Sequence, residues 1–374
     1  MNFSFRKHKD LIPIILLISV AFVTGITGLI SLTIIFIVSQ LRFGTDPQGK
    51  HGLSSGNSRL GGIAVICSAY ISLFVYTYVL DHPYTSQINN QEVGVIELTA
   101  LAIGSIGLIE DVSQQLGSLL RLSAMVIIIA LGLWYLPELL PIKLDVWFNT
   151  EPQSFSIMLY LFTIIMITGF INAGNISDGA NGLLVTIYLA FFIVLLSFDH
   201  SVLYVSLIIA LLTFALYNIL VGKVILGDFG AYVLSALVAL NCLKIYGQND
   251  VSVFLFASLL VYPCFEILRS LTLRILTGVS PFDPDNNHFH NYVNKWILSM
   301  GYSGHKANSL TGIGIACLTS GPPFLIFLNN EAPSSNLWLY IFMIEILIPS
   351  LLYLLLLRAF GIKQQEEFLK VKSL

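Results

Sequence analysis

Residues 172–184 read NAGNISDGANGLL, and the rest of the chain is arranged around this polar stretch. It interrupts two strongly apolar runs and places Asn172, Asn175, Asp178 and Asn181 at intervals of three residues. That spacing stacks side chains along one side of a helix start or a tight turn. A carboxylate among amides and glycines suits a magnesium-bound phosphate, because its oxygens are hard ligands and glycine lets backbone N–H groups approach closely. Taken alone, the stretch fits an ordinary turn between two membrane helices even better.

The composition excludes an ordinary soluble protein. The chain has 374 residues, of which 56% are hydrophobic and only 10% charged, and its mean hydropathy is +0.84. These values are typical of a polytopic membrane protein. A net charge of -3 gives no reason to expect a nucleic-acid partner. The cysteines lie singly in apolar runs, so we expect them to be small core residues rather than zinc ligands or a redox pair.

Eleven apolar runs are candidates to cross a hydrocarbon core of roughly 30 Å. Their approximate limits are 11–39, 60–80, 93–109, 119–136, 156–173, 183–198, 202–221, 231–246, 251–276, 307–328 and 337–359. The first run is too long for the apolar part of a signal peptide. No internal repeat or low-complexity linker divides the chain, so we predict an all-α membrane protein with a single domain over residues 1–374.

The positive charges predict which ends of these helices face the cytoplasm. Lys and Arg gather in the odd-numbered junctions and the C-terminal tail, whereas the opposite side keeps Lys143, Lys244 and the basic residues of the N-terminal tail. We therefore expect the N-terminus outside and the C-terminus in the cytoplasm, with the basic N-terminal tail as the one misfit.

The polar segments that look chemically active all fall in odd-numbered junctions, which places them on one membrane face. They are residues 50–62 (KHGLSSGNSRLGG), 107–112 (GLIEDV), 172–184, 222–230 (GKVILGDFG) and 280–296 (SPFDPDNNHFHNYVNKW). The loops on the opposite face are short or lack such clusters. This distribution predicts a site at the cytoplasmic face of the bundle.

The side chains in these junctions supply what phosphoryl transfer requires. Carboxylates hold Mg2+, and cations orient phosphates, while little covalent chemistry is left to the protein. The candidates are Asp111, Asp178 and Asp228 as oxygen donors, Glu110 beside the first, His288 and His290 for proton handling or phosphate contact, and Lys50, His51 and Arg59 as cations. Zinc is less suited, because only two histidines lie close together and no cysteine joins them.

Several of these residues also have a purely structural interpretation. Glu110 and Asp111 fit solvated charge at a helix end, and Asp228 fits a cap of a helix beginning near Ala231. The segment His288–Phe289–His290 fits a loop that packs its aromatic ring inward. Glu266 and Arg269, three residues apart, indicate a structural ion pair.

Taken in order, the motifs resemble the polyprenyl-phosphate N-acetylhexosamine-1-phosphate transferases, the membrane enzymes of glycosyltransferase family 4. SRLGG at 58–62 is similar to the PRxGG element, NISDGANGL at 175–183 to NxxDGxxGL, and GDFG at 227–230 to GDxG. SPFDPDNNHFH at 280–290 resembles the SPFxPDxxHxHH segment, and looks closer to the branch that uses UDP-N-acetylglucosamine than to the UDP-MurNAc-pentapeptide branch.

This resemblance implies eleven spans in the bacterial cytoplasmic membrane and a cytoplasmic site that depends on Mg2+, with Mn2+ as a substitute. It implies transfer of an N-acetylhexosamine 1-phosphate from a UDP-sugar to undecaprenyl phosphate with release of UMP, the first step of a cell-envelope polysaccharide such as an O-antigen. By the same resemblance Asp228 and Asp178 become metal ligands, Asp111 the candidate base, and His288 and His290 contacts of the donor diphosphate. The expected substrate-binding residues are Lys50, His51, Arg59, Asn172, Asn175 and Asn181.

Three positions depart from the family pattern. Glu110 stands where the first of two aspartates is usual, Asn181 replaces a frequent aspartate, and Asn291 follows His290 where a further histidine is common. The departures leave a catalytically inactive lipid-phosphate-binding relative as one alternative. A secondary transporter is the other, although transporters place their ionisable groups near the membrane midplane rather than at one face. Undecaprenyl phosphate, a UDP-N-acetylhexosamine and the lipid bilayer are the expected partners, and a homodimer is left open.

Overall fold

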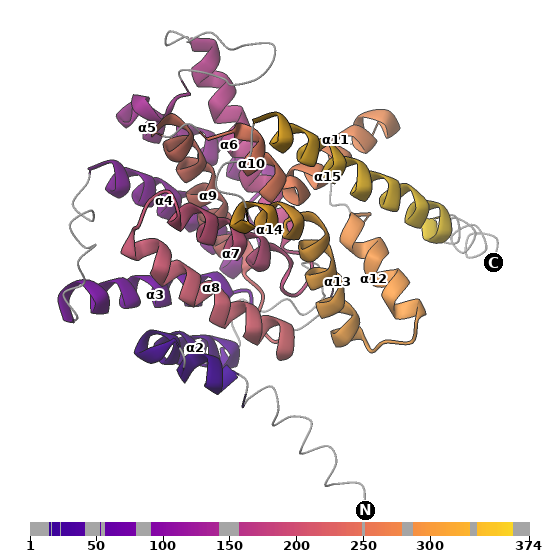
Figure 1. The fold of residues 1–374 in the computed structure, drawn as a ribbon, viewed down its shortest axis with the longest axis horizontal. Coiled ribbons are helices and arrows are strands. Elements are labelled where there is room, and N and C mark those ends of the chain that lie inside the picture. Colours follow the sequence, from indigo (N-terminus) through magenta and orange to yellow (C-terminus); the bar gives the residue numbers. More distant parts are fainter. Residues whose placement is uncertain are drawn as a thin grey trace, which may run out of the picture.

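The structure is a computed structural model of a bundle of helices (Figure 1). It describes residues 15, 17–22, 24–41, 53, 57–79, 91–141, 157–248, 251–278, 287–329 and 335–361. Within these ranges there is one isolated bridge, Ser58 with Val224, and no strand. The prediction of an all-α protein is therefore confirmed.

The helices follow the apolar runs closely. They are α2 (Gly25–Gln40), α3 (Gly61–Phe74), α4 (Gln91–Ser113), α5 (Ser118–Tyr135), α6 (Ile157–Ser177), α7 (Leu183–Leu196), α8 (Val202–Leu220), α9 (Gly227–Gln248), α10 (Val253–Leu259), α11 (Val261–Thr277), α12 (Phe289–Ser299), α13 (Gly304–Thr319), α14 (Gly321–Asn329) and α15 (Ser335–Leu356). Short segments η1 (Val75–Val79), η3 (Pro137–Leu139) and η4 (Leu357–Gly361) extend or link them. Each predicted run contains at least one helix.

The number of membrane spans is confirmed only in part. Among the described residues, seven helices are long and apolar enough to cross a membrane, and up to nine cross if each of two bent pairs is one span. The pairs are α10 with α11, bent by 77°, and α13 with α14, bent by 46°. The remaining apolar helices, α2 and α7, are shorter. Eleven spans and their orientation in the membrane stay predictions.

Two features of the C-terminal half differ from the prediction. The run 251–276 was expected as one span, but the chain bends at Leu260, where α10 ends and α11 begins. The junction that follows contains the amphipathic helix α12, which apolar run length cannot reveal because half of its residues are polar.

Helix α9 is the most enclosed of the spans. In its most apolar stretch 78% of the residues are buried, against 22% in α5 and α15. It packs chiefly on α4, α6 and α3, and Figure 1 shows it in the middle of the bundle. Small residues permit this close packing, as usual between membrane helices: a Cβ on Gly104 would lie 2.0 Å from Val233, and one on Gly174 2.0 Å from Ser235.

Polar groups mark both ends of α9. Asp228 lies in its first turn, and Lys244 near its other end forms an ion pair of 2.9 Å with Asp199 from the loop between α7 and α8. Sixteen residues of helix separate the two by about 24 Å, close to the thickness of a hydrocarbon core. The site described below therefore lies at one end of the bundle rather than at its middle.

Candidate active site at the start of α9

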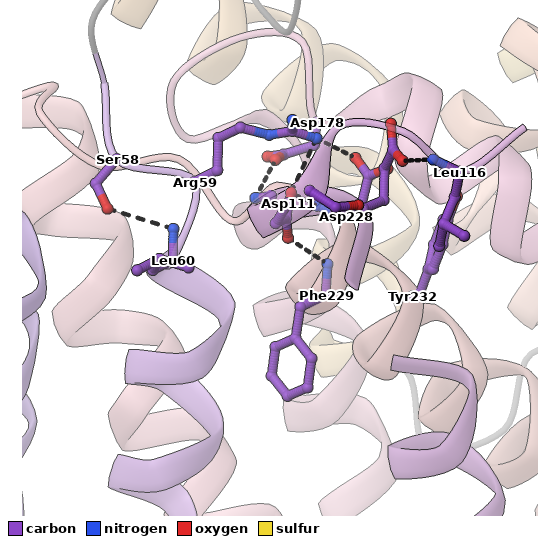
Figure 2. A network of polar contacts seen from close by, with 12 residues as sticks. Ser58, Arg59, Leu60, Asp111, Leu116, Asp178, Asp228, Phe229 and Tyr232 are labelled. Atoms are coloured by element: carbon purple, nitrogen blue, oxygen red, sulfur yellow. Dashed lines mark hydrogen bonds and ion pairs between the residues drawn. The ribbon is translucent and has the colours of Figure 1, made fainter. Parts of the chain in front are cut away.

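Four segments converge on the first turn of α9: residues 57–62, the end of α4, the start of α5 and the turn 178–182 after α6 (Figure 2). The first of these is held by backbone hydrogen bonds to the segment before α9. The N–H of Ser58 donates to Lys223 O at 3.0 Å and that of Ile225 donates to Ser58 O at 2.9 Å, while Gly61 and Gly62 donate to Ile225 and Leu226. This pairing fixes Arg59 beside α9.

The glycines of the SRLGG and GDFG motifs make the convergence possible. A Cβ on Gly62 would lie 2.1 Å from the Cα of Gly230, so the two backbones touch where α3 meets α9. Gly227 begins α9 with a φ of +72°, and a Cβ there would lie 2.0 Å from the carbonyl oxygen of Arg59. Only glycine combines this conformation with so close an approach.

Asp111 at the end of α4 holds the N-terminus of α9. Its Oδ1 accepts the N–H of Asp228 at 3.0 Å and its Oδ2 accepts the N–H of Phe229 at 2.8 Å. These are N–H groups that a helix start leaves without an intrahelical partner. The sequence predicted that Asp228 itself caps a helix beginning near Ala231; instead the helix begins at Gly227 and the capping carboxylate comes from α4.

Arg59 lies between two aspartates and is completely buried. Its Nη2 contacts Oδ1 of Asp111 at 2.9 Å and Oδ1 of Asp228 at 3.0 Å. Its Nε and Nη1 are buried without a hydrogen-bond partner in the part of the chain that the structure describes. Two buried donors that lack an acceptor are costly, so this guanidinium is suited to bind an additional oxygen ligand.

Arg121 on α5 is a second cation at the site. From the sequence it was only one of the basic residues in the odd-numbered junctions. Its Nη1 lies 2.9 Å from Oδ2 of Asp228 and 3.5 Å from the hydroxyl of Tyr232, and its side chain is 20% exposed. Its position just after the GLIEDV junction is the one signal that could have identified it.

Asp178 completes the cluster from the turn after α6. Its Oδ2 accepts the N–H of Gly227 at 3.1 Å. Burial raises the pKa of Asp178 well above its usual range; the Gly227 N–H acts in the opposite direction, and the negative charges of Asp111 and Asp228 add to the increase. The two arginines form ion pairs with Asp111 and Asp228 but with no oxygen of Asp178, so a cation bound beside Asp178 would favour the ionised form of that carboxyl group.

The other polar residues of these junctions hold loops in place. Glu110, predicted to act in catalysis, is buried and accepts the N–H of Leu116 at 2.8 Å, so it shapes the turn that leads to α5. Asn181 is buried, and its N–H donates to Oδ1 of Asn308 at 2.8 Å, which ties the turn to α13.

Asn172 and Asn175 lie on α6 before the turn rather than within it. The amide of Asn172 donates to Thr168 O within the same helix, and Asn175 is half-buried near the helix end. A helix start was expected at these four residues, but Asn172 and Asn175 lie in the last turns of α6, and Asp178 and Asn181 lie in the turn that follows it. Lys50 and His51 lie outside the described residues.

His288 and His290 form a second polar cluster next to the first. Their rings stack with centroids 5.3 Å apart at the start of α12. His290 is buried, its Nδ1 lies 2.9 Å from the Tyr262 hydroxyl, and its Nε2 lies 2.1 Å from where a Cβ of Gly179 would stand. Burial, together with the nearby His288, lowers the pKa of His290 to about 3. A neutral His290 therefore packs against the turn that carries Asp178.

The ion pair expected between Glu266 and Arg269 is present, with Nη2 and Oε2 2.9 Å apart. Glu266 does more than pair with Arg269, because its Oε2 also contacts Nδ1 of His288 at 3.0 Å. The sequence did not predict this contact, because 22 residues separate Glu266 from His288.

The donor set suits Mg2+ in its chemistry. No group of three or more Asp, Glu, His or Cys side chains is arranged as a metal site among the described residues, and both oxygens of Asp228 face arginines. Asp178 and Asp228 nevertheless bring carboxylate oxygens to the first turn of α9, and such hard oxygens are the ligands that Mg2+ prefers. These two residues would hold the ion.

Comparison with known proteins agrees with the motifs. Residues 93–246 match the family described as glycosyl transferase family 4. This range includes Asp111, Arg121, Asp178 and Asp228 but neither Arg59 nor the histidine cluster.

Individual relatives extend the similarity over most of the chain. A protein of Bacillus subtilis (strain 168), named probable undecaprenyl-phosphate N-acetylglucosaminyl 1-phosphate transferase, is 25% identical over 356 residues, 88% of this chain and 89% of its own. An undecaprenyl-phosphate alpha-N-acetylglucosaminyl 1-phosphate transferase of Thermotoga maritima is 30% identical over 158 residues, 41% of this chain and 50% of its own. A phospho-N-acetylmuramoyl-pentapeptide-transferase of Clostridium perfringens is 22% identical over 296 residues, 74% of this chain and 89% of its own. The resemblance to the membrane transferases of glycosyl transferase family 4, predicted from the motifs, is thereby confirmed.

Proposed function

We propose that the chain transfers an N-acetylhexosamine 1-phosphate from a UDP-sugar to undecaprenyl phosphate and releases UMP, as the first step of a cell-envelope polysaccharide. The relatives' names support a polyprenyl-phosphate acceptor and a hexosamine 1-phosphate group. The observation that carries the proposal is Arg59, a fully buried guanidinium inside a cluster of three aspartates, with two nitrogens that have no acceptor among the described residues. Such a group is suited to bind phosphate oxygens.

The residues divide the work as follows. A phosphate oxygen of the acceptor attacks the β-phosphorus of the donor, and the bond from that phosphorus to the bridging oxygen breaks, so that UMP leaves with the electron pair. Arg59 and Arg121 bind and orient phosphate oxygens, while Asp111 keeps the start of α9 in position. Mg2+, held by Asp178 and Asp228, would neutralise charge on the diphosphate.

The position of Asp111 favours this direct route over a covalent intermediate. Both of its oxygens accept N–H groups of α9, and Oδ1 also contacts Arg59, so neither is directed at a substrate. The role of base that the resemblance implied for Asp111 is therefore replaced, in our proposal, by a positioning role. The acceptor phosphate is itself an anion and needs no base to attack.

The same placement disfavours a transporter. The cluster lies at one end of α9, about 24 Å from the ion pair at the other end, whereas transport sites lie near the midplane. We propose that the site faces the cytoplasm of a bacterial cell, across its inner membrane, with the C-terminus on the same side and the N-terminus outside.

The test uses full-length protein in lipid nanodiscs with undecaprenyl phosphate, Mg2+ and a panel of UDP-sugars. We expect UMP release and a lipid-linked product with at least one UDP-N-acetylhexosamine. Asp228→Asn should abolish both, whereas Asp199→Asn, at the other end of α9, should keep them because the asparagine still accepts from Lys244. If no donor gives product, the chain is a catalytically inactive relative. Normal turnover by Asp228→Asn would show that the reaction does not need the Asp228 carboxylate.

A further inference from the structure

Glu266 on α11 is the centre of the histidine cluster, and no part of the proposed mechanism uses it. The side chain is completely buried, just after the bend between α10 and α11. Its Oε1 accepts the N–H of Phe289 at 2.6 Å, and the Tyr262 hydroxyl lies 3.4 Å from the same oxygen. Its Oε2 accepts from Nε and Nη2 of Arg269 at 3.2 and 2.9 Å.

A buried carboxylate needs hydrogen-bond partners, but Glu266 has more of them than an ion pair with Arg269 alone would supply. Burying an ion is costly unless hydrogen bonds satisfy its oxygens. Arg269 is itself fixed, since its Nη1 donates to the hydroxyl of Tyr353 at 3.2 Å and its guanidinium lies over the Tyr353 ring. The ion pair therefore fixes Glu266, on α11, relative to α15. Both of its carboxylate oxygens still contact residues at the start of α12.

Glu266 controls His288 in two ways. Oε1 holds the N–H of Phe289, the first residue of α12, which fixes the backbone next to His288. Oε2 lies 3.0 Å from Nδ1 of His288. Nη2 of Arg269 also lies 3.0 Å from Nδ1, but that nitrogen already donates to Oε2 at 2.9 Å, and a carboxylate can only accept. A hydrogen bond between His288 and Glu266 therefore requires a proton on Nδ1, and the other ring nitrogen, Nε2, remains for a ligand. The His288 side chain is 13% exposed, against 5% for Arg269 and 0% for Glu266, so the histidine is the most accessible of the three.

The histidine cluster lies next to the aspartate cluster. His288 stacks on His290, and His290 packs against Gly179, the residue after Asp178. The two clusters are therefore joined through the turn 178–182, and a diphosphate bound at one of them lies beside the other. We propose that Glu266 is a positioning residue that holds the His288 imidazolium through its Nδ1 proton, so that the proton on Nε2 can be donated in a hydrogen bond to an oxygen of the donor diphosphate. This inference rests on the proposed function.

The kinetic test compares Glu266→Gln with Glu266→Asp. The glutamine has no negative charge to hold Nδ1–H of His288, so we expect the KM for the UDP-sugar to rise about 10-fold, equivalent to about 1.4 kcal/mol, with the KM for undecaprenyl phosphate unchanged. The aspartate should restore part of the loss. In a His288→Ala background Glu266→Gln should have no further effect, because the two residues act as a unit.

A spectroscopic readout keeps the test independent of turnover. Nitrogen-15 spectra of the full chain in nanodiscs should show His288 protonated at Nδ1, and this signature should be lost in Glu266→Gln while Asp199→Asn, which breaks no contact to the cluster, retains it. An unchanged His288 signal, equal rises in both KM values, or additive effects with His288→Ala would overturn the inference. A wild-type protein without transfer activity would instead refute the proposed function, and the spectra would still decide the role of Glu266.

Discussion

Arg59 has no exposed surface, yet only its Nη2 has partners among the described residues. In the sequence Arg59 is a candidate cation within SRLGG, and no contact was predicted for it. The structure shows why an arginine stands there: one nitrogen reaches both Asp111 and Asp228, and the planar group keeps two more donors aligned beside them. In our proposal a single residue thus serves both the stability of the cluster and the binding of a phosphate.

The residue-scale prediction concerns this double role. Arg59→Lys keeps the charge but has no planar fork, so we expect kcat/KM to fall by roughly 100-fold or more, that is about 2.7 kcal/mol of transition-state binding. Arg59→Gln also leaves the buried carboxylate of Asp111 without a cation and Asp228 with Arg121 alone, and should lower the free energy of unfolding by about 3–5 kcal/mol. Turnover of each variant and its thermal unfolding in nanodiscs measure the two effects separately. A lysine variant as active as the wild type would refute the need for a fork.

At the scale of helices, apolar run length predicted most elements to within a few residues, because a membrane helix must satisfy its backbone hydrogen bonds internally over a fixed thickness. What could not be predicted depends on contacts between distant segments. The start of α9 at Gly227 requires the capping carboxylate of Asp111, and the position of Arg121 matters only because α5 brings it to Asp228. The bend at Leu260 interrupts an apolar run, and Pro263 in the first turn of α11 is the nearest feature of the sequence that could have indicated it.

The element-scale prediction tests the contact between α3 and α9. A Cβ on Gly62 would collide with the backbone of Gly230 at 2.1 Å, and a backbone cannot rotate away as a side chain can. We expect Gly62→Ala to lower the thermal unfolding temperature and to abolish transfer, because it separates Arg59 from α9. Gly169→Ala in α6 is the matched control, since nothing lies within 4 Å of its Cβ position. Equal stability of the two variants would contradict the packing described.

At the scale of the whole molecule, the polar groups divide between the two ends of the bundle. Arg59, Arg121 and the three aspartates gather at the start of α9, and the Lys244–Asp199 pair lies at its far end. The sequence analysis reached the same division from charge distribution, because inserted helices keep most lysines and arginines on one side. Which end faces the cytoplasm depends on the number of spans before α9. Only the distribution of positive charges predicts that orientation.

The last prediction therefore concerns orientation. Lys223 precedes the site and His200 adjoins the far ion pair, and both side chains are exposed. Single cysteines at these positions, in a background without the four natural cysteines, should react differently with a membrane-impermeant maleimide. We expect His200→Cys to be labelled in intact cells and Lys223→Cys only after permeabilisation, because the donor and acceptor phosphates are expected in the cytoplasm. The reverse pattern would place the site outside the cell, where no UDP-sugar is available, and would refute the proposed reaction while leaving the geometry of the site unchanged.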